Sequence, residues 1–287
     1  MGEVLDICLD ALLDSLRVFP FLFLMYVLIE LLEHRTDITR RKNILRGGLA
    51  PLLGAATGII PQCGFSVMAA KLYDRRLIRT GTLLAVFVAT SDEAVPLLAA
   101  EPGMWGALPL LLGGKVAAGV AAGFLLDVPL RRVLPAGLYG GYAGHADEVD
   151  CHEEHEEHSG ILLAALRHTV EIFLFILLFS FLIGLAFEWI GEAAITAFLL
   201  NMGVFQPMAA ALVGLIPNCA SSVLLAQLYA QGAISFGSLF AGLCAGAGIG
   251  LAVLWRVNPS WKQNLFMTGL LWAGGSLCGI LLQWVII

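Results

Sequence analysis

Gly58-Ile59-Ile60-Pro61-Gln62-Cys63 and Gly214-Leu215-Ile216-Pro217-Asn218-Cys219 are two copies of one motif within this chain. Around them, residues 51–126 align with residues 207–282 without a gap, at a constant offset of 156. Other matched pairs are Ser66/Ser222, Tyr73/Tyr229, Gly81/Gly237, Trp105/Trp261 and Gly123/Gly279. The alignment indicates an internal duplication, so the two halves should fold in the same way.

The composition is that of a membrane protein. Hydrophobic residues make up 59% of the chain and charged residues 13%, whereas soluble domains carry about 25% charged residues. The apolar segments are rich in Leu, Ala, Gly and Phe, which predicts an all-α polytopic membrane protein rather than a barrel. They run over Val18–Leu32, Leu49–Tyr73, Thr82–Ala100, Met104–Leu126, Ile172–Phe187, Val204–Tyr229, Ile234–Trp255 and Leu265–Ile287. We expect a multi-pass protein of the cell (plasma or inner) membrane.

Each half should contain three spanning helices and one segment that proline breaks in its middle. Leu49–Ile60 would form about 18 Å of helix at ~1.5 Å per residue, which is too short for a hydrocarbon core of about 30 Å. Pro61 and Pro217 then remove a backbone donor, which favours a break. The broken segment is either one kinked spanning helix or a re-entrant helical hairpin with the proline at its tip.

The placement of basic residues favours the hairpin. Basic residues lie on both flanks of the first broken segment: Arg35, Arg40, Arg41, Lys42 and Arg46 before it, and Lys71, Arg75, Arg76 and Arg79 at its far end. Because positive loops stay cytoplasmic, the segment should enter and leave on one side. The flanks of Val204–Tyr229 contain no Lys or Arg, whereas Arg256 and Lys262 lie in a loop whose counterpart has none. The two halves are therefore predicted to form an inverted-topology repeat.

Three regions follow from this scheme. They are a first transmembrane repeat (1–128), a cytoplasmic linker rich in His and Glu (129–159) and a second, inverted transmembrane repeat (160–287). In the linker, His152, His155 and His158 recur every three positions among glutamates. Imidazoles with carboxylates are ordinary ligands for divalent transition metals, although a solvated acidic loop also explains the glutamates.

The two hairpin tips are the predicted substrate site. In an inverted pair, both tips point toward the bilayer midplane, and a broken helix exposes unpaired backbone groups there. The predicted binding residues are Gln62, Cys63, Ser66, Asn218, Cys219 and Ser222. The thiols of Cys63 and Cys219 suit a soft metal or metalloid. The alternative is that these small residues only cap the break.

A second group of polar residues interrupts the apolar pattern. Asp92 and Glu93 are adjacent carboxylates inside the segment Thr82–Ala100, and Lys115 lies halfway along the next segment. Their counterparts in the second half are uncharged. Ionisable residues within a membrane usually face a cavity or a proton path, so we predict cation binding by Asp92 and Glu93 and coupling through all three. The alternatives are a position near the membrane surface or a salt bridge to Lys115.

The motifs GxxPQCGxS (58–66), ATSDEA (89–94) and GLIPNCASS (214–222) resemble those of the ten-helix heavy-metal exporter family. Members of that family are often labelled manganese transporters or arsenic efflux permeases. The resemblance covers both repeats and hence most of the chain. It implies about six full spans plus four half-helices and the export of a metal or metalloid.

Together, these features predict a secondary transporter that exports a heavy-metal cation or metalloid, such as arsenite or manganese, in exchange for protons. No ATP-binding motif, resident cofactor or catalytic residue is expected, and the partners are the lipid bilayer and a small ion, with a homo-oligomer left open. Nucleic-acid binding has no support, because topology explains the basic residues. One alternative is a small-anion transporter that uses helix N-termini. The other is a membrane thiol enzyme, which would lack an activating His near either thiol.

Overall fold

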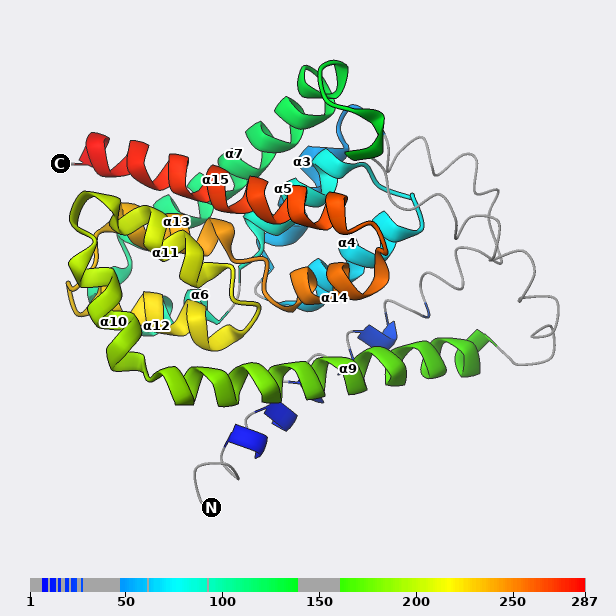
Figure 1. Ribbon diagram of the computed structural model, residues 1–287, viewed down its shortest axis with the longest axis horizontal. Coiled ribbons are helices and arrows are strands. Elements are labelled where there is room, and N and C mark those ends of the chain that lie inside the picture. The colour runs from blue at the N-terminus through cyan, green and yellow to red at the C-terminus, as the bar shows by residue number, and fades with distance from the viewer. Residues whose placement is uncertain are drawn as a thin grey trace.

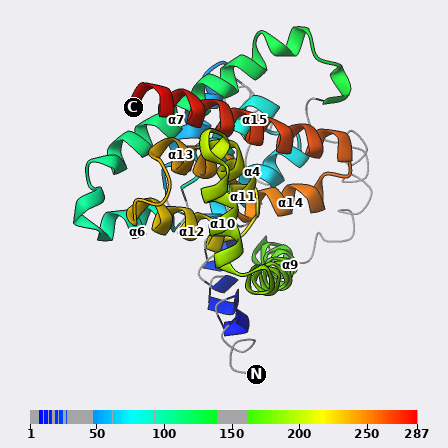
Figure 2. The same cartoon turned by 60° about the vertical axis from the view of Figure 1, so that its left-hand side comes forward.

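The computed structural model describes residues 7–9, 11–13, 15–16, 19–20, 22–24, 27, 47–60, 62–91, 93–138 and 161–286. Every regular element in these residues is a helix. The longest helix, α9 (Ile161–Ile190), lies along the lower edge in Figure 1, with α7 (Ala107–Asp127) and α15 (Trp261–Ile286) across the upper part. Figure 2 shows α9 nearly along its axis and well apart from α7.

Several described segments are long and apolar enough to cross a membrane. Five pass on length and composition, namely Thr80–Ala100, Ala107–Asp127, Thr169–Ile190, Phe236–Val257 and Trp261–Val285. A sixth candidate is a pair of helices bent by 116°, Glu192–Asn201 with Gly203–Gly214. The prediction of an all-α polytopic membrane protein is confirmed.

Short helices flank both copies of the proline motif. They are α3 (Ala50–Gly58) and α4 (Gly64–Asp74) in the first half, and α11 (Gln206–Gly214) and α12 (Cys219–Ala230) in the second. The turn between each pair of helices is closed by the same backbone hydrogen bond. Gln62 N donates to Ile60 O at 2.7 Å in the first copy, and Asn218 N donates to Ile216 O at 2.8 Å in the second. Pro61 itself lies outside the described residues. The helix breaks lie where the sequence predicted them.

Close glycine contacts give the direction of the chain around the first turn. At the start of α5 (Thr80–Ala89), Gly81 lies against Gly123 of α7, and so does Pro51 at the start of α3. At the other end, Gly58 of α3 lies so near Ala89 that a Cβ added to it would be 2.8 Å away. Helices α3 and α5 therefore run side by side in the same direction. Since α4 leads back to the start of α5, the chain returns to the level at which α3 began.

The second half repeats these contacts at the offset of 156. Gly237 at the start of α13 (Phe236–Ala245) lies against Gly279 of α15, as Gly81 lies against Gly123. The turns after α4 and α12 also match, because Arg76 (φ 54°) and Gly232 (φ 72°) both adopt the left-handed conformation. The duplicated sequence thus forms matching local structure down to single backbone angles.

The first span after each proline motif departs from the sequence-based expectation of an ordinary helix. Helix α5 ends at Ala89 and α6 (Ala94–Ala100) begins after a break, and α13 ends at Ala245 before α14 (Ile249–Val257). Pro96 explains the first break, because proline is tolerated only in the first turn of a helix, so that a new helix must begin just before it. Gly248, with φ 54° and ψ −149°, allows the second. The expectation of continuous spans was wrong here.

The interrupted spans lie inside the molecule and the continuous ones outside. In Phe236–Val257, 94% of the most apolar window is buried, against 22% in α7 and 28% in α15. The helix that follows each proline motif packs on the other half, since α4 contacts α14 and α12 contacts α6. Ser66 of α4 and Gly250 of α14 approach so closely that a Cβ on the glycine would lie 2.5 Å from Ser66 Cβ. The breaks therefore meet in the centre of the fold.

One end of the molecule is basic. Tyr73 Oη at the end of α4 donates to Gln263 Oε1 at the start of α15 (3.2 Å), and Arg256 at the end of α14 pairs with Glu171 in the first half of α9 (2.8 Å). Every described Lys and Arg except Lys115 lies at this end: Lys71, Arg75, Arg76, Arg79, Arg131, Arg132, Arg167, Arg256 and Lys262. The described residues also form four short 3₁₀ turns: Pro102–Met104, Leu130–Arg132, Ala136–Leu138 and Gly203–Phe205. The start of α5 and the end of α14 thus share one end of the molecule.

Candidate functional site

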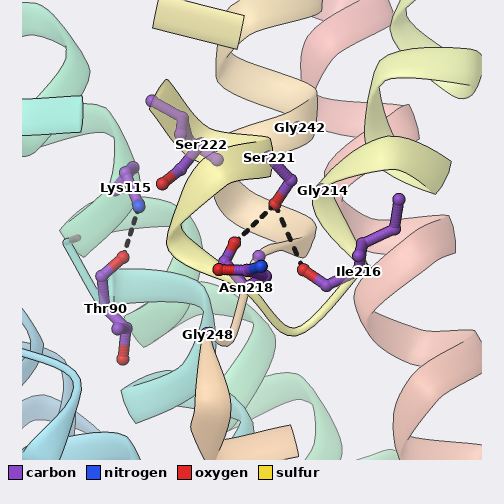
Figure 3. A pocket seen from close by; sticks show the side chains of 11 residues that line it. Thr90, Lys115, Gly214, Ile216, Asn218, Ser221, Ser222, Gly242 and Gly248 are labelled. Carbon is purple, nitrogen blue, oxygen red and sulfur yellow. Dashed lines mark hydrogen bonds between the residues drawn. The ribbon is translucent and has the colours of Figure 1, made fainter. Parts of the chain in front are cut away.

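A small buried cavity lies where the two breaks meet the α11–α12 turn (Figure 3). The first half contributes Thr90 and Lys115. The second contributes Gly214, Ile216, Asn218, Ser221, Ser222, Gly242, Leu243, Gly246 and Gly248. Its volume of about 10 Å³ leaves room for about one water molecule. In this conformation, the cavity can hold a small ion or a water but nothing larger.

Four helix ends converge on this cavity. Helices α5 and α13 end there, at Thr90 and Gly246, and such ends carry carbonyls without intrahelical partners and a partial negative charge. Helices α12 and α14 begin there and present amides with a partial positive charge. Asn218 caps α12, with its Oδ1 accepting from Ala220 N at 3.3 Å. Ends of both polarities suit the binding of a small polar solute.

The serine hydroxyls of the cavity donate to the backbone of their own turn. Ser221 Oγ lies 2.8 Å from Asn218 O and 3.1 Å from Ile216 O, and Ser222 Oγ donates to Cys219 O at 2.8 Å. Since a hydroxyl has one hydrogen and two lone pairs, these oxygens keep acceptor capacity. They can therefore coordinate a cation or accept a hydrogen bond from a solute.

Lys115 brings a buried charge to the end of α5. Its side chain is 2% exposed, and Nζ donates to Thr90 O at 2.5 Å (Figure 3). A cation is stabilised there by the partial negative charge of the helix C-terminus. The counterpart in the second half is Leu271, which is fully buried, so the end of α13 has no matching lysine. The pairing of Lys115 with Asp92 or Glu93 stays a prediction.

A larger cavity of about 430 Å³ opens on the other side of Asn218. We call it the vestibule. It is lined by Ile7, Ala11, Glu93, Ser180, Gly184, Phe187, Glu188, Glu192, Asn218, Cys219, Ala220 and Val223. Glu188 lies at the end of α9 and Glu192 at the start of α10 (Glu192–Asn201), remote from the basic end. Three carboxylates and no described basic side chain line the vestibule, so it should concentrate cations.

The structure divides the predicted binding residues between different surroundings. Asn218 and Ser222 line the central cavity, and Asn218 and Cys219 line the vestibule. Gln62, Cys63 and Ser66 line neither cavity. Ser66 donates to Cys63 O at 2.7 Å, as Ser222 does to Cys219 O, but it packs against α14 instead.

The predicted metal ligands are not brought together in the described residues. Among these, no three His, Cys, Asp or Glu residues lie close enough to hold a metal ion. Glu93 faces the vestibule, whereas Asp92, His152, His155 and His158 lie outside the described residues. Sequence reasoning missed Ser221, Glu188 and Glu192. The adjacent serines after Asn218 were a usable signal, but no local pattern shows that α9 would bring its glutamates to the turn.

Residues 143–255 match the model of a family described as "Putative, 10TM heavy-metal exporter". The matched stretch is therefore similar to this family, and it covers less than half of the chain. The match runs from the linker through α9 to α14 and includes the Asn218 turn and the Gly248 break. No curated protein and no solved structure matches the chain. The resemblance to this exporter family is confirmed over these residues, and the description names a membrane transporter rather than an enzyme.

Proposed function

We propose that the protein is a secondary transporter that exports a heavy-metal cation or metalloid, with the α11–α12 turn as the barrier in its path. One observation carries the proposal, namely that Asn218 lines both the buried central cavity and the open vestibule. A solute that moves between the two must pass this residue. The conformation described here is open to the vestibule and closed around the centre.

The orientation of the protein in the membrane rests on the charge distribution. Basic loops stay in the cytoplasm, which assigns the basic end to the cytoplasmic side and the vestibule to the opposite side. The inverted repeat belongs to the same proposal. It is supported by the shared location of the start of α5 and the end of α14, which requires the two interrupted spans to run in opposite directions. Re-entrant hairpins are supported by the return of α4 to the start of α5.

Proton coupling through Lys115, Asp92 and Glu93 is part of the proposal. The buried ammonium of Lys115 lines the cavity that a cation would enter. Two unit charges about 8 Å apart repel by about 2 kcal/mol at an effective dielectric constant of about 20. A cation in the cavity should therefore favour loss of a proton from Lys115. Exchange of cations for protons requires that binding of one disfavours binding of the other.

The two thiols have different parts in this scheme. Cys219 is 7% exposed and faces the vestibule, whereas Cys63 packs against the hydrophobic core. We therefore propose that Cys219 meets a thiophilic ion on the vestibule side, without joint ligation by Cys63. Oxygen and nitrogen groups alone would then hold the ion in the central cavity.

A small anion is the second candidate substrate. The central cavity is lined by the Lys115 ammonium and by the N-termini of α12 and α14, and no described carboxylate lines it. Backbone amides at helix N-termini are ready anion-binding groups. An oxyanion is larger than the cavity of this conformation, so it would bind to these groups only after the cavity widens.

The test is uptake into proteoliposomes of the purified protein, over a panel of divalent metals, arsenite and small oxyanions, with the internal pH recorded at the same time. Asn218→Ala and its counterpart in the other copy, Gln62→Ala, form a matched pair. We expect cation or metalloid transport with opposite proton movement, and a loss in Asn218→Ala at least tenfold greater than in Gln62→Ala. Transport of oxyanions alone would support the second candidate, and equal activity of the two variants would remove the Asn218 turn from the path.

A further inference from the structure

An apolar groove opens on the side of the molecule between α9, α14 and α15. It has a volume of about 530 Å³. Its lining includes Phe175, Phe179, Leu215, Pro217, Trp255 and Arg256. Leu215 and Pro217 form its inner end and belong to the α11–α12 turn, while Trp255 and Arg256 lie toward the basic end.

The medium outside this groove is lipid. All three helices that form its walls belong to segments that pass the length and composition criteria for membrane spans. Next to the groove, Leu174 and Leu178 of α9 and Leu265 of α15 are each more than half exposed. Such a surface is compatible with acyl chains and not with water.

The groove is large enough for an acyl chain. Its volume of about 530 Å³ is many times the roughly 10–15 Å³ that leaves room for one water molecule, so a chain of several methylene groups fits. The two α9 residues that line it, Phe175 and Phe179, lie about 6 Å apart along the helix at ~1.5 Å per residue.

The mouth of the groove is suited to an anionic headgroup. The Arg256 guanidinium stacks 4.6 Å from the Phe175 ring centroid, bonds Glu171, and keeps 32% of its side chain exposed. Beside it, Trp255 is 45% exposed and donates to Thr268 Oγ1 at 3.2 Å. Tryptophan and arginine are typical anchors at the membrane interface, and basic residues there attract anionic lipids.

We propose that one acyl chain of an anionic phospholipid, from the leaflet at the basic end, occupies this groove and supports the α11–α12 turn. Leu215 and Pro217 line the groove, while Ile216 and Asn218 line the central cavity. Alternate residues of the turn thus face the lipid and the substrate path. A chain in the groove packs behind the turn and limits its movement. Resting on the proposed function, the inference extends to transport, whose rate the lipid composition of the membrane then sets.

The test uses the purified full-length protein, washed free of lipid in detergent. Binding of phosphatidylglycerol and of phosphatidylcholine with the same long chains is measured by native mass spectrometry and by the shift in unfolding temperature. Dihexanoyl phosphatidylglycerol separates headgroup binding from chain binding. Arg256→Gln removes the charge at the mouth, and Arg132→Gln, which lies at the basic end outside the groove, is the matched control.

We expect one retained molecule of long-chain phosphatidylglycerol per protein, with little binding of phosphatidylcholine or of the short-chain lipid. Arg256→Gln should bind it about tenfold more weakly, and Arg132→Gln should bind it like the wild type. Arg256→Gln also breaks the bond to Glu171, so a second variant is needed. Phe179→Trp fills the groove and leaves the charge of Arg256 in place, and it should also weaken binding of the long-chain lipid. Equal binding of the two lipids, wild-type binding by both groove variants, or a lipid-free dimer would overturn the proposal. None of these measurements depends on the cargo.

Discussion

Replacing Gly214 with alanine should separate two helices at the wall of the central cavity. A Cβ on Gly214 would lie 2.7 Å from the carbonyl carbon and 2.9 Å from Cα of Gly242, and closer still to the Gly242 oxygen. Carbon atoms pack best at about 3.5–4.0 Å, so α11 and α13 must move apart by about 1 Å. Because both neighbours are backbone, no side chain can turn away to relieve the contact. Overpacking of this kind costs about 1–3 kcal/mol.

Gly269→Ala is the matched control. Gly269 lies within α15, and a Cβ there meets no atom within 4 Å, as is also true of its counterpart Gly113. Alanine is better than glycine inside a helix by about 1 kcal/mol. The two substitutions should therefore differ in unfolding free energy by about 2–4 kcal/mol, with opposite signs relative to the wild type.

The assay is thermal unfolding of the purified variants in one detergent, followed by uptake into proteoliposomes. We expect Gly214→Ala to unfold several degrees below the wild type and to transport at least tenfold more slowly, and Gly269→Ala to match or exceed the wild type in both. If Gly214→Ala has the same unfolding temperature and transport rate as Gly269→Ala, then α11 and α13 do not make this backbone contact and the cavity geometry is wrong.

Three further outcomes are expected. Lys115→Met should lower cargo uptake at least tenfold and abolish the accompanying change in internal pH. Leu271→Met, at the matching position of the second half, should change neither uptake nor the internal pH. Proton movement that persists in Lys115→Met would exclude the lysine from coupling. Glu192→Gln, in the vestibule, should raise the KM for a cation applied from the vestibule side a few-fold at low ionic strength and less at high salt. Glu101→Gln, an exposed residue outside the vestibule, is the control, and equal effects of the two substitutions would contradict the concentration of cations by the vestibule. Asp127→Asn should lower the free energy of unfolding by about 1 kcal/mol, because the buried carboxylate accepts from Gly81 N at 2.9 Å at the N-terminus of α5; an unchanged unfolding temperature would argue against this cap.

The two interrupted spans show the limit of local sequence reasoning. Pro61 and Pro217 predicted breaks near them, because proline acts on its own backbone and needs no partner. The break between α5 and α6 had a similar signal in Pro96, at the first turn of the second helix. The break at Gly246–Gly248 had only glycines, which also permit close packing of continuous helices. Such a helix end is stable only where other segments supply partners for its backbone groups.

By itself, the sequence determined the membrane class, the duplication and its offset of 156, because composition, apolar segments and matched residues can be read without knowing what each segment packs against. Only the tertiary structure decided which copy of the motif lines the cavity. The packing of α4 on α14 and of α12 on α6 turns Ser66 against a helix and leaves Ser222 at the cavity wall, although both make the same local hydrogen bond. The physical reason is that a cavity is formed by the surfaces of segments far apart in the chain, so two nearly identical sequences can face different surroundings.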